Sequence, residues 1–100
     1  MDRILHIRRT WPSKVPCVVS YGNSKIKLIM PREHTIGHLM LHTRSQLIKR
    51  NLCARSKDKG FFMFHNDKLM SGTTVIGDLD TKKSGVIGFT CQEESVFGGS

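Results

Sequence analysis

Two runs near the start of the chain are rich in β-forming residues and are apolar at consecutive positions. Residues 14–21 read KVPCVVSY and residues 25–30 read KIKLIM, and the intervening Gly22, Asn23 and Ser24 are typical of a hairpin turn. Such strands present apolar side chains on both faces of a sheet, because successive side chains point to opposite faces. The rest of the chain must therefore cover both faces, at least in part.

The main cover is an amphipathic helix. It follows Pro31, starts from Thr35, which is a good N-cap residue, and runs to about Asn51. At about 3.6 residues per turn, its inward side chains fall on one stripe that faces the core. The stripe consists of Ile36, Leu39, Met40, Thr43 and Leu47.

The second face of the sheet can be covered only by the amino-terminal segment. Ile4, Ile7 and Trp11 fall at helical spacing, and Pro12 ends the turn that carries them. We therefore expect residues 1–12 to form a short helical segment that lies across this face.

Two further strands and a short helix are expected after the main helix. Residues 61–65 form a strand that ends at the turn Asn66-Asp67, residues 74–79 form at most a short helix, and residues 85–91 form a last strand. This order predicts an α+β domain with the ubiquitin-like β-grasp fold, in which one main helix covers a four-stranded mixed sheet. The first and last strands are expected to be parallel neighbours in its middle.

Composition and charge narrow the function only slightly. The chain has 100 residues, of which 38% are hydrophobic, and this suits one core and one domain. We expect neither a signal peptide nor a membrane span, because no apolar run is long enough. The net charge of +8 calls for an anionic partner or surface. The spacing of the basic residues matches neither a zinc finger nor an aromatic RNA-binding motif, so we expect no nucleic-acid partner. A basic nucleic-acid-binding module is therefore kept only as a third candidate, behind the two classes of function described below.

No set of residues in the sequence predicts catalysis or metal binding. The three cysteines are an odd number without C-x-x-C spacing, which indicates reduced cytoplasmic thiols. Cys53 has basic neighbours but no nearby base or partner cysteine. His34, His38 and His42 recur every four residues, but no carboxylate or cysteine completes a ligand set. We therefore expect no enzymatic activity, no metal and no cofactor.

Four blocks of the chain carry a family resemblance. They are IRRTWPSKVPCVV from Ile7, LIMPREHTIGHL from Leu28, FMFHND from Phe62 and ESVFG from Glu94. In this order they resemble the landmarks of the autophagy-related protein 8 family, the ubiquitin-like modifiers that include GABARAP and light chain 3. The sister modifier autophagy-related protein 12 resembles the chain less in the WPxKVP block. Family members usually begin with two short helices, whereas only ten residues precede Trp11, so the chain resembles a divergent member with a shortened amino terminus.

The resemblance implies a role for the last residues. In this family a cysteine protease cuts after the glycine that follows a phenylalanine, here Gly98 after Phe97. Activating and conjugating enzymes then join the new carboxylate to phosphatidylethanolamine. Glycine suits these acyl transfers because it has no Cβ to shield the carbonyl. Residues 94–100 would be a conjugation tail after a ubiquitin-like domain of residues 13–93, and the two residues after Gly98 would be removed. Alternatively, those two residues are an expression remnant or a frayed end.

The resemblance also implies a peptide-binding site on the strand at residues 25–30. This strand lies at an edge of the β-grasp sheet and can accept an extended peptide as an added strand. Family members bind acidic motifs of aromatic-x-x-aliphatic type there. By position, the aromatic pocket consists of Ile7, Pro16, Val18, Lys27, Ile29 and Val86. The aliphatic pocket consists of Leu28, Met30, Pro31, His34, Leu39 and His42. His34 and His42 stand where the family usually has apolar residues.

Together these features imply a non-enzymatic modifier that is conjugated to lipid, acts in autophagosome formation and recruits cargo adaptors. It would be cytoplasmic and would associate with autophagosome or vesicle membranes once lipidated. The covalently attached lipid would be the membrane anchor, and the basic residues would add electrostatic attraction to anionic lipid. Two alternatives stay open: a ubiquitin-like interaction domain that is never conjugated, and a protein modifier similar to autophagy-related protein 12.

Overall fold

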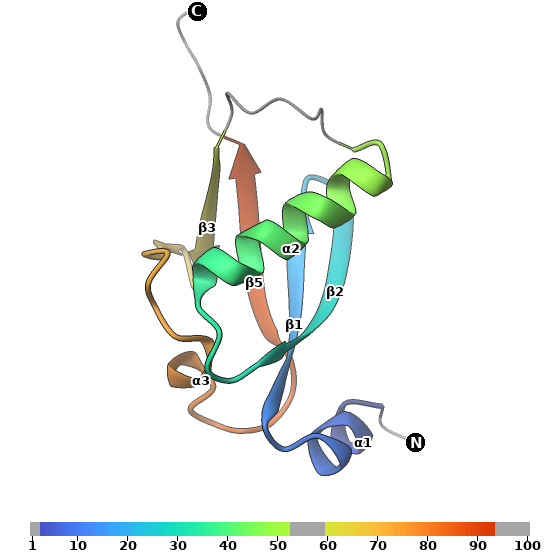
Figure 1. Ribbon diagram of the computed structural model, residues 1–100, viewed down its shortest axis with the longest axis vertical. Helices are drawn as coiled ribbons and strands as arrows, with labels where there is room; N and C mark the ends of the chain where they lie inside the picture. The colour runs from blue at the N-terminus through green and yellow to red at the C-terminus, as the bar shows by residue number, and fades with distance from the viewer. Residues whose placement is uncertain (1–2, 53–59, 94–100) are drawn as a thin grey trace, which may run out of the picture.

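The computed structural model describes residues 3–52 and 60–93. The predictions for Cys53 and for the tail at residues 94–100, including the cleavage site, lie outside these residues, as does the side chain of Ile4. Eight elements follow one another along these described residues (Figure 1). They are α1 (Arg3–Thr10), β1 (Lys14–Tyr21), β2 (Ser24–Pro31), α2 (Ile36–Lys49), β3 (Phe61–His65), β4 (Lys68–Leu69), α3 (Ile76–Leu79) and β5 (Ile87–Glu93).

The order of the elements agrees with the prediction, and the largest shift is at the last strand. β1 and β3 have the predicted bounds, whereas β5 begins at Ile87 instead of residue 85. Gly85 has φ 71°, a left-handed conformation that glycine adopts without strain. The chain therefore turns at Gly85, and the strand can begin only after this turn.

The sheet has one strand more than predicted. Its order is β2-β1-β5-β3-β4, and β1 pairs antiparallel with β2 and parallel with β5, so the first and last strands are central and parallel, as predicted. Asn66 and Asp67 have φ 53° and 64°, the left-handed conformation of a two-residue hairpin turn. This turn folds Lys68–Leu69 back onto β3 as the fifth strand, β4.

The core lies between the sheet and α2, which runs diagonally across one face (Figure 1). Val15, Cys17 and Val19, at alternate positions of β1, point into this core and are at most 2% exposed. The predicted stripe of α2 faces the same core. Met40 is half-buried there, and the other members are fully buried, namely Ile36, Leu39, Thr43 and Leu47.

The second face of the sheet has less cover than predicted. α1 lies beside the start of β1, at one end of the sheet, and does not extend along the face (Figure 1). The helix ends at Thr10, so Trp11 lies beyond it and is 44% exposed. Phe62 of β3, next to the buried Met63, is 41% exposed. The prediction of a covering helix is therefore right only for the end of the sheet near α1.

Thr43 offers a test of the core, because its side chain is fully buried and its Oγ1 has no hydrogen-bond partner among the described residues. Valine keeps the branched shape without the hydroxyl. We expect Thr43→Val to raise the free energy of unfolding by about 1 kcal/mol, as measured by urea denaturation. Thr43→Ala is the control, and it should lower that free energy by about 1 kcal/mol because it removes a buried methyl group as well. A valine variant less stable than the wild type would contradict this account.

Candidate peptide-binding site

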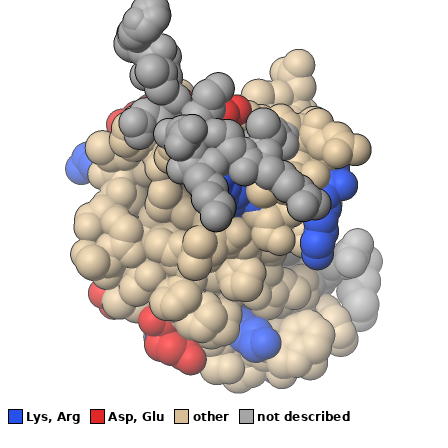
Figure 2. All heavy atoms as spheres, turned by 45° about the horizontal axis from the view of Figure 1, so that its top comes forward, with Lys and Arg blue, Asp and Glu red and all other residues tan. Residues whose placement is uncertain are grey.

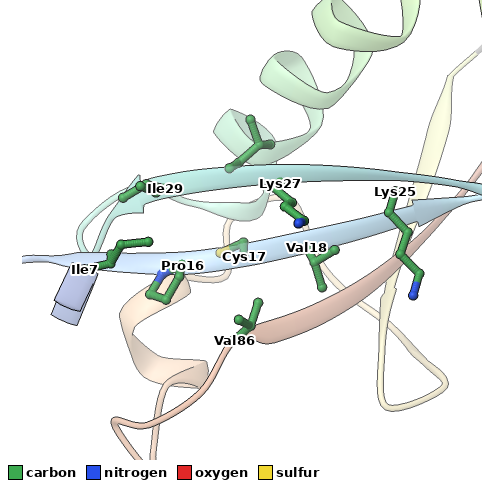
Figure 3. A pocket seen from close by; sticks show the side chains of 9 residues that line it. Ile7, Pro16, Cys17, Val18, Lys25, Lys27, Ile29 and Val86 are labelled. Carbon is green, nitrogen blue, oxygen red and sulfur yellow. The ribbon is translucent and has the colours of Figure 1, made fainter. Parts of the chain in front are cut away.

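An apolar pocket of about 460 Å³ opens on the side of the sheet opposite α2 (Figure 3). Its lining comes from α1, β1, β2 and the residue that precedes β5. All six residues predicted for an aromatic pocket line it, namely Ile7, Pro16, Val18, Lys27, Ile29 and Val86. The lining also includes residues that the sequence analysis did not assign to this pocket, namely Cys17, Lys25 and Leu28.

The strand register brings these side chains together. Pro16 is opposite Ile29 and Val18 is opposite Lys27 in the antiparallel β1–β2 pair. Directly opposed residues point to the same face of the sheet, so these four side chains form one surface. The parallel β1–β5 pairing begins close by, and this places Val86, just before β5, beside the same surface (Figure 3).

The pocket combines an apolar interior with a basic rim. Ile29 and Val86 are 42% and 41% exposed, although both are large apolar side chains. Lys25 and Lys27 are exposed at alternate positions of β2, and both line the pocket. An occupant with an apolar ring and a neighbouring acidic group would match both features.

Cys17 borders the pocket as part of β1, but its side chain points into the core on the α2 side of the sheet. It is 2% exposed, and its thiol donates a hydrogen bond of 3.5 Å to the carbonyl oxygen of Val15. Burial, aided by the charge of Asp80, raises the pKa of the Cys17 thiol to about 12. The thiol therefore stays protonated at neutral pH, and its surroundings do not favour a nucleophilic role.

The strand beside the pocket is an edge strand. β2 pairs only with β1 in the described sheet, so alternate backbone groups of β2 point away from the sheet. Arg50, just after α2, donates a hydrogen bond of 3.3 Å from Nη1 to the carbonyl oxygen of Lys25. This bond identifies the Lys25 carbonyl as one of the outward-facing acceptors of the edge.

The structure does not bring the six residues predicted for the aliphatic pocket into one open site. Met30 and Leu39 are core residues, 2% and 0% exposed. The alternation of side chains along β2 points Met30 inward, and the helical repeat of α2 does the same for Leu39. Leu28 lines the pocket with Ile29, while Pro31 is half-buried and His42 is exposed on α2. A second side chain of a bound peptide could therefore not contact Met30 or Leu39, because both are buried.

The remaining predicted residue, His34, stacks on His38 with the ring centroids 4.4 Å apart. His38 Nδ1 lies 3.1 Å from the backbone nitrogen of Thr35 and accepts its hydrogen, which completes a capping box at the start of α2. Within the described residues, no group of three or more histidine, cysteine or acidic side chains is arranged to hold a metal ion.

A buried carboxylate joins α1 to the segments that follow β2 and α3. Asp80, just after α3, is 4% exposed and accepts hydrogen bonds from two arginines. Arg8 of α1 donates to both of its oxygens at 3.1 and 2.8 Å, and Arg32, after β2, donates to Oδ2 at 2.8 and 2.6 Å. The hydrogen bonds from Arg8 and the charges of Arg8 and Arg32 hold the pKa of Asp80 below its usual value, against the effect of burial. The sequence analysis missed this network because the partners are 72 and 48 positions apart.

Charge is dispersed over the face seen in Figure 2. Among the coloured residues, the lysines and arginines stand apart from one another, mostly near the margins of the view. The net charge of +8 is therefore not gathered on this face. None of the described helices is long and apolar enough to cross a bilayer.

The strand order, the parallel central pair and the long helix across one face define a ubiquitin-like β-grasp fold. The chain is similar to the crystal structure of Trypanosoma brucei ATG8, with a TM-score of 0.77 and 16% identity, over 96% of this chain and 86% of that chain. It is also similar to a de novo protein designed on the basis of ubiquitin, with a TM-score of 0.59 and 11% identity, over 89% of this chain and 99% of that chain. No family model or curated protein matches the chain. At these identities the likeness is one of fold, which is ubiquitin-like and similar in form to that of ATG8.

The Asp80 network predicts acid sensitivity. Because the pKa of Asp80 is lowered in the folded state, its contribution is fully present above the ordinary value of 3.8 and is lost as the pH falls through the lower folded value. Asp80→Asn should lower the free energy of unfolding at pH 7 by about 3 kcal/mol, because it leaves two arginines facing a neutral group. It should also flatten the loss of stability between about pH 5 and pH 2.

Denaturation by urea at a series of pH values tests this prediction. Asp78→Asn is the matched control, because Asp78 lies two positions away on α3 and is exposed. If Asp80→Asn loses stability on acidification as steeply as the wild type, Asp80 is not the source of the acid sensitivity.

Proposed function

We propose that this chain is a ubiquitin-like modifier of autophagy that binds acidic aromatic-x-x-aliphatic motif peptides of receptors and cargo adaptors. The observation that carries the proposal is the apolar pocket of about 460 Å³ beside the open edge of β2. The ATG8-like form of the fold supports the same function, as does the resemblance of the four sequence blocks.

A motif peptide would bind as an added strand on β2. Its backbone would bond to the outward-facing groups of β2, such as the carbonyl of Lys25, in exchange for the Arg50 contact. Its aromatic side chain would enter the pocket between Ile29 and Val86. Acidic residues next to the aromatic residue would approach Lys25 and Lys27. The aromatic pocket therefore supplies most of the binding in this proposal, because two residues of the expected aliphatic pocket are buried.

The proposal includes conjugation through the carboxyl terminus. A cysteine protease would cut after Gly98, and activating and conjugating enzymes would transfer its carboxylate to phosphatidylethanolamine. The chain would then move from the cytoplasm to autophagosome or vesicle membranes, with no catalytic activity of its own. The sequence block ending Phe97-Gly98 supports this part. The competing candidates are a ubiquitin-like interaction domain that is never conjugated and a protein modifier similar to autophagy-related protein 12.

The first test concerns the pocket. Burying an aromatic ring there should contribute about 1.5–3 kcal/mol, so Ile29→Glu should weaken binding of an acidic aromatic-x-x-leucine peptide at least about tenfold. Lys27→Glu should weaken it by a smaller amount that shrinks as salt is added. Isothermal titration calorimetry measures both effects.

Leu41→Glu is the control for these titrations. Leu41 is 69% exposed on α2, so the same chemical change falls on the opposite side of the sheet from the pocket. Equal affinity of the wild type and Ile29→Glu would reject the pocket as the docking site.

The second test concerns the tail. Mass spectrometry of the protein recovered from its own cells should find a soluble form that ends at Gly98 and a membrane form that carries phosphatidylethanolamine. Gly98→Ala should slow conjugation because a Cβ crowds the reacting carbonyl, while thermal melting stays unchanged. Intact Gly99-Ser100 on both forms would reject processing and favour the unconjugated alternative.

A further inference from the structure

Two walls of the pocket come from segments outside the paired strands. Ile7 belongs to α1, which precedes the sheet, and Val86 lies between the turn at Gly85 and the start of β5. By contrast, Pro16, Val18 and Ile29 are held by the β1–β2 ladder. The positions of Ile7 and Val86, and hence the width of the pocket at this end, depend on contacts other than sheet hydrogen bonds.

One arginine joins these two segments. Arg8, the residue after Ile7, donates from Nε and Nη2 to the carbonyl oxygen of Gly85 at 3.0 and 2.9 Å. Gly85 is the residue before Val86. The same guanidinium therefore links the neighbours of both pocket walls, and its geometry fixes the separation of their backbones.

Asp80 holds that arginine in place. Its carboxylate accepts from Nη1 and Nη2 of Arg8, and the Arg8 and Asp80 side chains are only 11% and 2% exposed. Arg32 binds the same carboxylate from the segment between β2 and α2, so the carboxylate is anchored to the body of the domain. A planar guanidinium bound at both edges in this way has little freedom to reorient.

We propose that Asp80 and Arg8 are positioning residues for the peptide pocket, because they set the placement of Ile7 and Val86 on its two sides. The inference rests on the proposed function for the occupant of the pocket. If the hydrogen bonds of Arg8 to Asp80 and Gly85 are lost and α1 is docked only about a tenth of the time, the apparent affinity for the peptide falls about tenfold.

Arg8→Gln is the main test variant, because Asp80 keeps its pair with Arg32 and the fold keeps its buried charge partner. Arg9→Gln is the matched control, since Arg9 is the next residue on α1 and is exposed. Asp80→Asn and Asp78→Asn form a second pair of test variant and control.

Methyl NMR spectra of the peptide-free proteins report the positions of Ile7 and Val86, and the fully buried Ile26 methyl reports the intact core. Trp11 is the single tryptophan and follows α1 directly, so its fluorescence reports the docking of the helix.

We expect Arg8→Gln and Asp80→Asn to shift the methyl signals of Ile7 and Val86, to leave that of Ile26 unchanged and to weaken the acidic aromatic-x-x-leucine peptide about tenfold. Both control variants should resemble the wild type. All titrations are made at 25 °C without denaturant, and the NMR spectrum of each variant is used to show that it is folded. Under these conditions a change in stability alone does not shift the methyl signals of Ile7 and Val86. If Asp80→Asn does not fold, Arg8→Gln carries the test.

The outcomes separate this inference from the proposed function. Unshifted Ile7 and Val86 signals in Arg8→Gln overturn the inference whether or not the peptide binds. Shifted signals with unchanged peptide affinity overturn it as well. A wild-type chain that binds no peptide rejects the proposed function, whereas shifted signals in its Arg8→Gln variant still support the positioning role.

Discussion

The parallel pairing of β1 with β5 is the constraint on which the rest of the structure depends. It joins strands from the two ends of the chain, with Cys17 opposite Ile87, and a parallel pair requires a long crossover, which α2 and the segments around it provide. Because β1 is paired on both sides, its hairpin partner β2 is left at the edge of the described sheet. The same pairing brings Val86 next to β1, so the pocket and the open edge both follow from this contact.

The fold could be predicted because it depends on periodic patterns, whereas the residues of both pockets are assigned by position from the family resemblance. Alternation along β1 and β2 assigns Pro16, Val18, Lys27 and Ile29 to one face, and the structure has them there. The aliphatic set does not come together in the structure, because a position assigned from a family says nothing about burial, and Met30 turns inward. The strand β4 was not predicted, because its two residues are too few to show the alternation of apolar and polar side chains that marks a strand. The Asp80 network joins residues that are distant in sequence, and only the folded chain reveals such pairs.

The basic residues of this chain serve two different purposes. Arg8 and Arg32 both bind the buried carboxylate of Asp80 and neutralise it. Lys25 and Lys27, by contrast, are exposed to solvent at the pocket. Arg8, Arg32 and Asp80 together contribute only +1 to the net charge of +8, because one carboxylate offsets one of the two arginines. Guanidinium groups suit the inward role because they bind carboxylates through two parallel hydrogen bonds, and ammonium groups suit the solvated rim.

The two edges of the sheet differ in length, and this difference bears on self-association. β2 offers eight residues at one edge, whereas β4 offers two at the other, directly after a tight turn. For copies of a chain to polymerise through their sheets, each copy must present a donor edge and an acceptor edge of useful length. Here a strand added to β4 would gain few hydrogen bonds. Within the described residues, the short β4 edge therefore disfavours end-to-end stacking of sheets through β2 and β4.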